Sequence, residues 1–376
     1  MDNPQHIETI VVGGGQAGLC VGYHLARLGR PFVILDEQRR TGDNWRRHWD
    51  SLRLYTPARY DGLPGMPFPG PRSAFPTKDQ VADYLEAYAA RFDLPIRHGV
   101  KVREVTANGR GYVVDGGDQR FEADNVVVAT GTFGTRRYVP PFAAELDPSI
   151  DQLHSSEYHR LSQLQPGAVL VVGASHSGAD IAFEAAREHH TVLCGRPTGQ
   201  IPVPLESRRA RAVFPVLWFL ARHVFMLRTP IGRKMRPEIR THGGPLLRIQ
   251  ASDLAAVGVE RVTERVGGVR DGRPMLDGGR VLDVATVVWC TGFRQDLSWI
   301  RLPVLDDDGW PIEQRGVVPS APGLYFTGLA FQRSFSSMLV GGAGTDAKHI
   351  ASHIADHRAA DGVTAARARR PSEQAR

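Results

Sequence analysis

The chain has 376 residues, 42% of them hydrophobic and 23% charged, which is enough for two or three domains with sizeable cores. The net charge of +6 is compatible with anionic ligands, but basic and aromatic residues alternate in one segment only, so we predict no nucleic-acid partner. The three cysteines are scattered without a CxxC pair, which excludes a redox-active dithiol and favours a reducing compartment. The N-terminus lacks the features of a signal peptide, and we expect a cytoplasmic protein.

The first predicted unit spans residues 9–36 and consists of an apolar strand, a glycine-rich turn, a helix and a second apolar strand that ends at Asp36. This order is typical of a dinucleotide-binding fingerprint. Its first glycine permits the tight turn, the middle one lets the backbone approach a pyrophosphate, and the last lets the helix pack on the strand. The helix N-terminus would bind the pyrophosphate, and Asp36 would accept hydrogen bonds from ribose hydroxyls. The expected binding residues of the turn are Gly13, Gly15, Gln16, Ala17 and Gly18.

A loop-rich region follows, and we expect residues 57–76 to be irregular because they hold many prolines and glycines. Thr77 and Gln80 form a capping box that begins a helix, whose apolar stripe reaches Phe92. Short strands are expected around 100–105, at 112–114 and at 121, before an apolar run at 126–128. The cofactor contacts expected from this region are Asn44, Trp45, Val102, Ala129, Thr130 and Gly131.

A second copy of this plan begins near residue 168. A strand, a glycine-rich turn, a helix to about residue 190 and another strand recur, and the copy closes at Thr291 and Gly292. Gly13 precedes Thr130 by 117 positions, and Gly173 precedes Thr291 by 118. Two dinucleotide-binding units explain this repeat better than chance. The expected binding residues of the second turn are Gly173, Ser175, His176, Ser177 and Gly178.

The two copies differ at the end of their second strand, where Asp36 and Arg196 occupy the same offset, 23 positions after the first glycine. An acid there pairs with ribose hydroxyls, whereas an arginine pairs with a 2′-phosphate through a contact worth about 1.5–3 kcal/mol. We therefore assign FAD to the first copy and NADPH to the second. The alternative for Arg196 is a solvated turn residue. His176 is either a phosphate or ribose ligand or only a residue at a helix N-terminus.

After the second copy the chain returns to the first unit, with Gly328 and a glycine-rich turn at 341–344 that opens a helix from Asp346. The cofactor contacts expected from the end of the second copy and from this return are Thr291, Gly292, Gly328 and Asp346. We therefore predict an α/β fold of two Rossmann-like dinucleotide-binding domains, the NADPH domain inserted into the FAD domain. The end of the chain is rich in alanine and arginine without apolar periodicity, which favours a frayed tail. The predicted ranges are 1–147 and 293–357 for the FAD-binding domain, 148–292 for the NADPH-binding domain and 358–376 for the tail.

An insertion at 202–245 in the second unit contains an apolar run flanked by arginine and lysine. The run cannot span a membrane, because a spanning helix needs about 20 uninterrupted apolar residues. Three roles remain open: a lid over a substrate channel, a basic amphipathic contact with a membrane surface through 213–236, and a contact with another subunit of an oligomer. A lid of this composition favours an apolar or aromatic substrate.

The order and spacing of these motifs resemble the class B flavin-dependent monooxygenases, particularly their YUCCA-like and CzcO-like bacterial members. The resemblance covers about residues 7–356. It implies that Trp45 lies near the flavin and that the Asp346 helix directs its positive N-terminal end at the flavin pyrimidine edge. The matching motifs are the two fingerprints, residues 42–45, 129–131 and 291–293, and the turn at 341–344.

The identifying motif of that family precedes the second fingerprint, and it is matched in part. His154 and Tyr158 occupy its histidine and aromatic positions, but Pro148 and Ile150 replace its phenylalanine and glycine. A tyrosine in place of tryptophan favours the heteroatom-oxidising or YUCCA-like branch, whereas the alternative for His154 is a histidine satisfied within its loop. Many members carry an asparagine after the flavin-side tryptophan, where this chain has residues 55–57, Tyr-Thr-Pro. This departure bears on how the oxygenated flavin is stabilised.

The resemblance implies a reaction in which NADPH reduces FAD, reduced flavin and O₂ form a hydroperoxide, and one oxygen atom passes to a small substrate. The transfer would be an N-, S- or YUCCA-type carbon oxygenation. The cofactor supplies the reactivity, and the sequence indicates neither a catalytic side chain nor a metal site. Two alternatives remain: an NADPH-dependent flavoprotein reductase or oxidase without oxygen insertion, and a nucleotide-binding membrane-peripheral protein.

Overall fold

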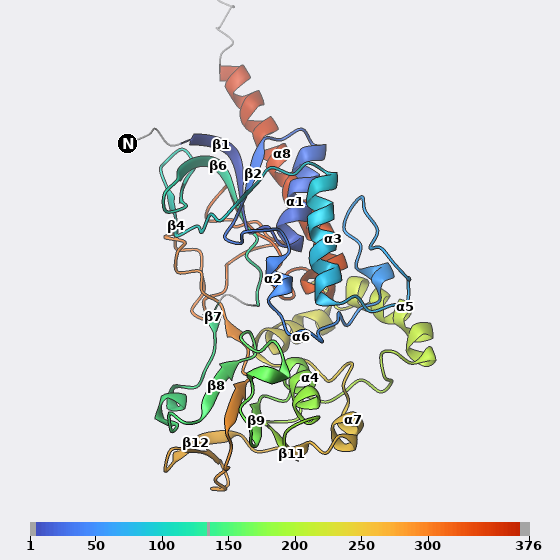
Figure 1. Ribbon diagram of the computed structural model, residues 1–376. Coiled ribbons are helices and arrows are strands. Elements are labelled where there is room, and N and C mark those ends of the chain that lie inside the picture. Colours follow the sequence, from blue (N-terminus) through green and yellow to red (C-terminus); the bar gives the residue numbers. More distant parts are fainter. Residues whose placement is uncertain (1–4, 134–135, 369–376) are drawn as a thin grey trace, which may run out of the picture.

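The computed structural model describes residues 5–133 and 136–368, and its strands form two main sheets in separate parts of the molecule (Figure 1). The first sheet has seven strands in the order β3-β2-β1-β6-β5-β4, with β16 paired to β6. Strand β6 changes partner along its length, because its first part pairs antiparallel with β5 and its last part pairs parallel with β16. The strands are β1 Gln5–Val12, β2 Phe32–Asp36, β3 Ile96–His98, β4 Glu104–Ala107, β5 Tyr112–Asp115, β6 Arg120–Val128 and β16 Leu324–Phe326.

The second sheet has five parallel strands in the order β11-β10-β9-β14-β8. Its first four strands repeat the order β3-β2-β1-β6 of the first sheet, and both sheets are apolar through their centres, as strands covered on both faces require. The two Rossmann-like units predicted from the sequence are therefore present. The strands are β8 Asp151–His154, β9 Val169–Val172, β10 Thr191–Cys194, β11 Glu260–Val262 and β14 Thr286–Trp289, with a separate hairpin of β12 Val266–Arg270 and β13 Arg273–Leu276.

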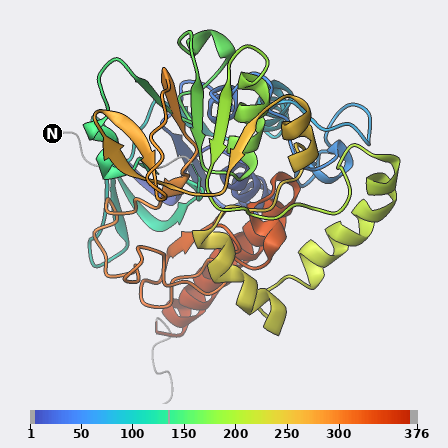
Figure 2. The ribbon, with the colours of Figure 1, turned by 90° about the horizontal axis from the view of Figure 1, so that it is seen from below.

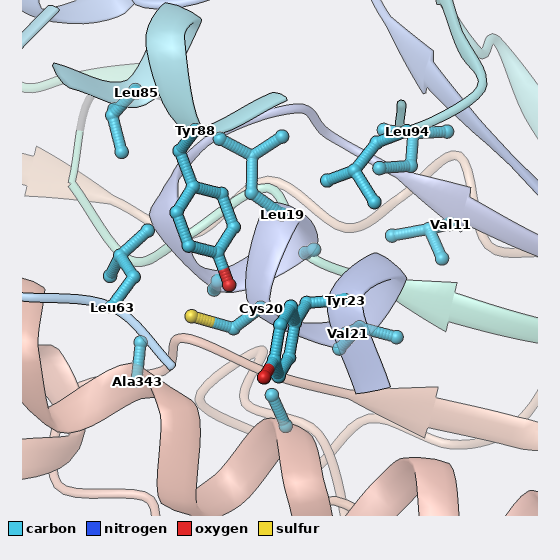
Figure 3. Close-up of a cluster of buried hydrophobic side chains, with 14 of the residues drawn as sticks. Val11, Leu19, Cys20, Val21, Tyr23, Leu63, Leu85, Tyr88, Leu94 and Ala343 are labelled. Carbon is cyan, nitrogen blue, oxygen red and sulfur yellow. The ribbon is translucent and has the colours of Figure 1, made fainter. Parts of the chain in front are cut away.

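Three helices share the main apolar core of the first unit: α1 (Gln16–Arg27), α3 (Lys78–Arg91) and α8 (Ala343–Ala368). In Figure 3, Cys20 of α1 lies between Tyr88 of α3 and Ala343 of α8, and Tyr23 of α1 lies beside Cys20. The predicted capping box begins α3, because Thr77 and Gln80 exchange side chain to backbone hydrogen bonds. Residues 57–76 are irregular apart from one 3₁₀ turn, as expected.

Two short strands carry the chain between the units. Strand β7 (Arg136–Arg137) leads out of the first unit and pairs antiparallel with β15 (Phe293–Arg294), which leads back. Ala143 and Leu146 follow β7 and pack in the second core beside Leu170. The predicted boundary at 147 is therefore too late, because an apolar residue in sequence does not reveal which of two cores it joins.

Four further helices belong to the second unit and its insertion. Helix α4 (His176–Ala185) follows the second turn, α7 (Ala251–Ala256) lies against it, and α5 (Arg208–His223) and α6 (Pro230–Thr241) form the insertion. Figures 1 and 2 place α5 at the periphery of the molecule. In the described ranges, no helix is long and apolar enough to cross a membrane.

Helix α8 differs from the prediction at both ends. It begins at Ala343 and not at Asp346, so the glycine-rich turn contributes its first residues. It also continues through 358–368, where the sequence predicts a frayed tail, and 369–376 lie outside the described residues. Alanine and arginine have high helix propensity, so this stretch extends the helix without an apolar stripe.

Candidate cofactor site

The first glycine-rich turn joins β1 to α1 and leaves no room for a side chain at Gly13 or at Gly18. Gly13 has φ +107°, and a Cβ there would lie 2.7 Å from the Ala129 carbonyl oxygen. A Cβ at Gly18 would overlap the Gly13 carbonyl oxygen. Helix α1 then begins at Gln16, with Gly15 as N-cap, no side-chain cap and no acid in its first turn. Its first amides are therefore available to an anion such as a pyrophosphate.

Asp36 ends β2 beside this turn, and its carboxyl group is buried. Its Oδ1 accepts a hydrogen bond from the Gln38 amide at 3.0 Å, and burial raises its pKa. A Cβ at Gly14 would overlap Oδ2, so Gly14 is needed at this position although the expected binding residues omit it. The Val100 amide donates to the Asp36 carbonyl at 2.9 Å and so brings the segment that contains Val102 to this edge.

Helix α2 (Asp43–Arg46) places two predicted residues next to the turn. The side-chain amide nitrogen of Asn44 lies 3.7 Å from where a Cβ at Gly15 would be. Trp45 packs against the apolar clusters of both units, and its indole N–H is buried with no partner in the described part of the chain. A buried donor without a partner costs about 1–3 kcal/mol, so this N–H fits an acceptor on a ligand.

The ends of β6 and β16 meet the start of α1. A Cβ at Gly328 would lie 2.8 Å from the Cβ of Ala17, and the buried hydroxyl of Thr327 has no partner among the described residues. Thr132, which the sequence did not single out, accepts a hydrogen bond from the Ala330 amide at 2.6 Å. The predicted residues Ala129, Thr130 and Gly131 follow β6 directly.

Asp346 lies in the first turn of α8 and is buried. The Arg333 guanidinium donates to its Oδ1 at 3.0 Å, and its Oδ2 has no partner in the described ranges. A Cβ at Gly341, in the preceding turn, would overlap the Tyr60 carbonyl oxygen. The turn therefore packs closely against the irregular segment of the first unit. Arg333 separately balances the negative charge of Asp346 at the positive N-terminal end of α8.

The second glycine-rich turn repeats the geometry of the first. Gly173 has φ +110°, and a Cβ there would overlap the Cys290 carbonyl oxygen, the counterpart of Ala129. A Cβ at Gly178 would overlap the Gly173 carbonyl oxygen. Helix α4 has Ser175 as N-cap, again without a side-chain cap or an acid in its first turn. Its first amides are therefore available to an anion in the same way.

The insertion covers this second turn in a way that no local pattern indicates. The Ser175 hydroxyl donates to the Gly244 carbonyl at 2.9 Å, and His176 Nε2 donates to the Pro245 carbonyl at 2.6 Å. Burial lowers the pKa of His176, which favours the neutral ring. The side chains of these two predicted cofactor-binding residues therefore bond to the insertion in this structure. Ser177, also predicted, is half-buried in the first turn of α4.

Arg196 follows β10 and is exposed. The preceding residue, Gly195, lies against the second turn, because a Cβ there would be 3.5 Å from Gly173 Cα. Residues 195–196, which follow β10, form a corner beside the second turn. Arg261 stabilises this corner by donating hydrogen bonds to the carbonyls of Leu193 at 3.1 Å and Gly195 at 2.6 Å. Arg261 was not predicted, and it gives the corner a second cation.

A buried polar group joins the two units beside the second turn. Asp180 of α4 accepts a hydrogen bond from the Tyr55 hydroxyl at 3.1 Å and forms an ion pair with Arg248 at 3.0 Å. The Tyr55 ring also lies 4.9 Å from that of His176. Burial raises the pKa of Asp180, and Arg248 opposes that shift. Tyr55 thus fastens the loop of the first unit to the helix of the second.

Comparisons with known proteins agree with this arrangement. The model of the pyridine nucleotide-disulphide oxidoreductase family matches residues 10–202. A CzcO-like uncharacterised oxidoreductase of Geobacillus kaustophilus is 37% identical over 94% of this chain and 100% of its own length. The probable indole-3-pyruvate monooxygenase YUCCA3 of Arabidopsis thaliana is 28% identical over 92% of this chain and 86% of its own. A solved flavin-containing monooxygenase from Stenotrophomonas maltophilia is 25% identical, with a TM-score of 0.75 over 94% of this chain and 99% of its own.

The chain belongs to the class B flavin monooxygenases. This monooxygenase is an oxidoreductase, and its cofactors are a flavin and a pyridine nucleotide, in agreement with the predicted FAD and NADPH. The family resemblance recognised from the sequence is therefore confirmed, as is the Rossmann-like α/β fold.

In this monooxygenase, the partly matched family motif lies where the chain crosses between units. His154 is buried, its Nε2 donates to the Gly292 carbonyl at 3.1 Å, and its Nδ1 accepts from the Ser156 hydroxyl at 2.8 Å. Its ring packs edge-on against Phe293 of β15 at 5.0 Å. The Thr291 hydroxyl donates to a carbonyl of the facing linker, that of residue 138. His154 is thus satisfied by protein groups and supports the crossing strand.

Asp61 is a buried acid of the monooxygenase that the sequence did not indicate. The Thr56 hydroxyl donates to its Oδ1 at 2.5 Å, while its Oδ2 has no partner in the described part of the chain. Burial raises the pKa of Asp61 to about 7. Its Cα lies 3.3 Å from the position of a Cβ at Gly341, so it adjoins the turn before α8.

Proposed function

We propose that this enzyme binds FAD at the first glycine-rich turn and NADPH at the second, and that it transfers one oxygen atom of O₂ to a small apolar or aromatic substrate. One observation carries the proposal: two turns of the same geometry are each followed by a strand with an opposite charge at its end, Asp36 as the last residue of β2 and Arg196 two residues after β10. In the strand pairing, Gly195 is the counterpart of Asp36, and Arg196 lies one position beyond it. A carboxylate suits the ribose hydroxyls of FAD, and an arginine suits the 2′-phosphate that distinguishes NADPH from NADH.

The residues around the first turn fit a flavin dinucleotide. The free amides of α1 suit its pyrophosphate, and Asp36 suits its ribose. The buried indole N–H of Trp45 and hydroxyl of Thr327 have no partner in the described ranges, and both would hydrogen-bond to a bound ring system. When bound, FAD supplies the redox and oxygen chemistry, and these residues hold it and exclude water.

The second turn fits NADPH through its backbone. The free amides of α4 suit a pyrophosphate, whereas Ser175 and His176 reach a phosphate only after they leave the carbonyls of Gly244 and Pro245. The amides and the Arg196 corner are therefore the principal ligands in this proposal. The side chains of Ser175 and His176 contribute if the insertion moves.

The inner face of α5 supports a small apolar or aromatic substrate. Tyr60 of the first unit stacks on Phe214 at 5.1 Å and lies 5.0 Å from Trp218. An open pocket of about 400 Å³ adjoins these rings, within the size range of small-molecule sites. It also reaches Gly341, in the turn before α8. Its lining includes Arg59, Tyr60, Leu63, Met66, Trp218, Arg222 and Gly341.

The test is the fate of the electrons from NADPH. Purified enzyme is supplied with amine, sulfide and 2-oxo-acid substrates, and NADPH consumption, oxygenated product and hydrogen peroxide are measured together. Oxygenated product that matches the NADPH consumed, for at least one substrate, supports the monooxygenase proposal. Release of all electrons as peroxide with every class of substrate contradicts it.

A flavoprotein oxidase is the second candidate, and the position of Tyr55 favours it. Where many family members carry an asparagine side chain, this chain has a tyrosine whose hydroxyl bonds to Asp180. No amide from this position is therefore directed at the flavin. In the same experiment, peroxide equal to the NADPH consumed would support the oxidase.

A further inference from the structure

Helix α5 has two apolar faces, and the described part of the chain covers only one of them. Phe214 and Ala221 on the inner face are buried, at 7% exposure each. On the outer face the side chains of Val216 and Phe219 are 57% and 58% exposed, and those of Val213 and Leu217 are 44% exposed. Ile231 of the adjoining helix α6 is 54% exposed. These five residues, Val213, Val216, Leu217, Phe219 and Ile231, are the outer apolar face.

The surroundings of the outer apolar face are strongly basic. Residues 208–241 contain nine arginines and lysines and a single acid, Glu238, so this segment has a net charge of +8 in a chain of +6. Two of the arginines are engaged inside the protein, because Arg236 pairs with Glu313 and Arg240 stacks on Trp310. The exposed cations Arg209, Arg211, Arg228, Arg233 and Lys234 form no ion pair with any residue that the structure describes.

We propose that the outer apolar face docks this enzyme on an anionic lipid bilayer. Apolar side chains that enter the headgroup boundary and cations that meet anionic lipid are the two contributions to interfacial helix binding. The position of α5 at the periphery leaves this face accessible (Figures 1 and 2). The proposal goes beyond the oxygenation reaction and does not depend on the substrate.

The positive charge of residues 208–241 favours a bilayer over a second copy of the chain as the partner of the outer apolar face. In a symmetric dimer the same patch faces itself, so the +8 segments of two copies would lie against each other. An anionic surface attracts each of these cations, and burial of the apolar face removes it from water. The same charges that oppose self-association therefore favour the lipid surface.

The experiment is co-sedimentation of the full-length, flavin-loaded enzyme with phospholipid vesicles. Vesicles of phosphatidylcholine with phosphatidylglycerol should bind the enzyme, and vesicles of phosphatidylcholine alone should bind it much less. The double variant Val216→Glu/Phe219→Glu should bind anionic vesicles at least about tenfold more weakly. Its matched control is Ile312→Glu. Ile312 is also exposed, at 53%, but it lies outside residues 208–241, so its substitution should leave vesicle binding unchanged.

A second variant separates charge from apolar contact. Arg233→Gln/Lys234→Gln should weaken binding to anionic vesicles by about fivefold for each cation lost, and salt should weaken the unsubstituted enzyme similarly. Flavin content and NADPH oxidation in solution confirm that each variant is folded.

Three results would overturn the proposal. One is failure of the unsubstituted enzyme to bind anionic vesicles at low salt, and another is equal binding by Val216→Glu/Phe219→Glu. The third is a concentration-dependent dimer that this variant disperses, without vesicle binding, which would assign the face to a subunit contact.

Discussion

The carboxyl group of Asp36 occupies the space into which a side chain at Gly14 would project. A Cβ at Gly14 would lie 3.0 Å from the carboxyl carbon of Asp36 and would overlap one of its oxygens. Gly14 does not have the positive φ that restricts Gly13, so the acid itself restricts this position. The end of β2 and the turn after β1 are thus fitted to each other.

Gly14→Ala should therefore displace Asp36 and weaken FAD binding. Loss of a charge-assisted hydrogen bond costs about 1.5–3 kcal/mol, which is about 10- to 100-fold in affinity. Flavin absorbance per protein after purification, followed by titration of flavin-free protein with FAD, measures this. The matched control is Gly268→Ala, because Gly268 lacks positive φ and has no atom within 4 Å of a Cβ. A Gly14→Ala enzyme with unchanged FAD affinity would contradict the assignment of FAD to this turn.

Arg196→Ala should raise the KM for NADPH by about 10- to 100-fold and leave the KM for NADH nearly unchanged, because only NADPH has a 2′-phosphate. Steady-state kinetics with both nucleotides measures the change. Arg270→Ala is the control, since Arg270 is exposed on β12, away from this corner. Equal shifts for the two nucleotides would show that Arg196 does not contact the phosphate.

The periodicity and glycine spacing of the sequence were enough to predict both sheets, because strand, turn and helix in a fingerprint are local features. The contacts of Ser175 and His176 were not predictable in this way, since their partners lie 69 positions later in the chain. Gly14 could have been found only by placing the Asp36 carboxyl group in space. Asp61 gave no signal because nothing near it in the sequence indicates burial.

Arg248→Ala should destabilise the protein by about 3–5 kcal/mol, because it leaves Asp180 buried without its ion-pair partner. The side chains of Asp180 and Arg248 are 2% and 16% exposed. The control is Arg301→Ala, whose pair with Glu104 is exposed and should contribute less than about 1 kcal/mol. Urea unfolding of the two variants measures the difference. Similar losses would show that the ion pair of Asp180 and Arg248 is not desolvated.

Asp61→Asn should change how stability depends on pH. The folded pKa of Asp61, about 7, lies above the ordinary 3.8, so the folded state binds its proton more tightly than the unfolded state. This contribution to stability is complete below about pH 4 and is lost as the pH rises through about 7, by up to about 4 kcal/mol. An asparagine accepts the hydrogen bond from Thr56 and does not ionise, so the variant should lose less stability between about pH 5 and about pH 8. Urea unfolding at both pH values measures this loss of stability. The control is Asp307→Asn, because Asp307 is exposed. Equal losses of stability in Asp61→Asn and in the unsubstituted enzyme would show that Asp61 is not protonated in the folded state.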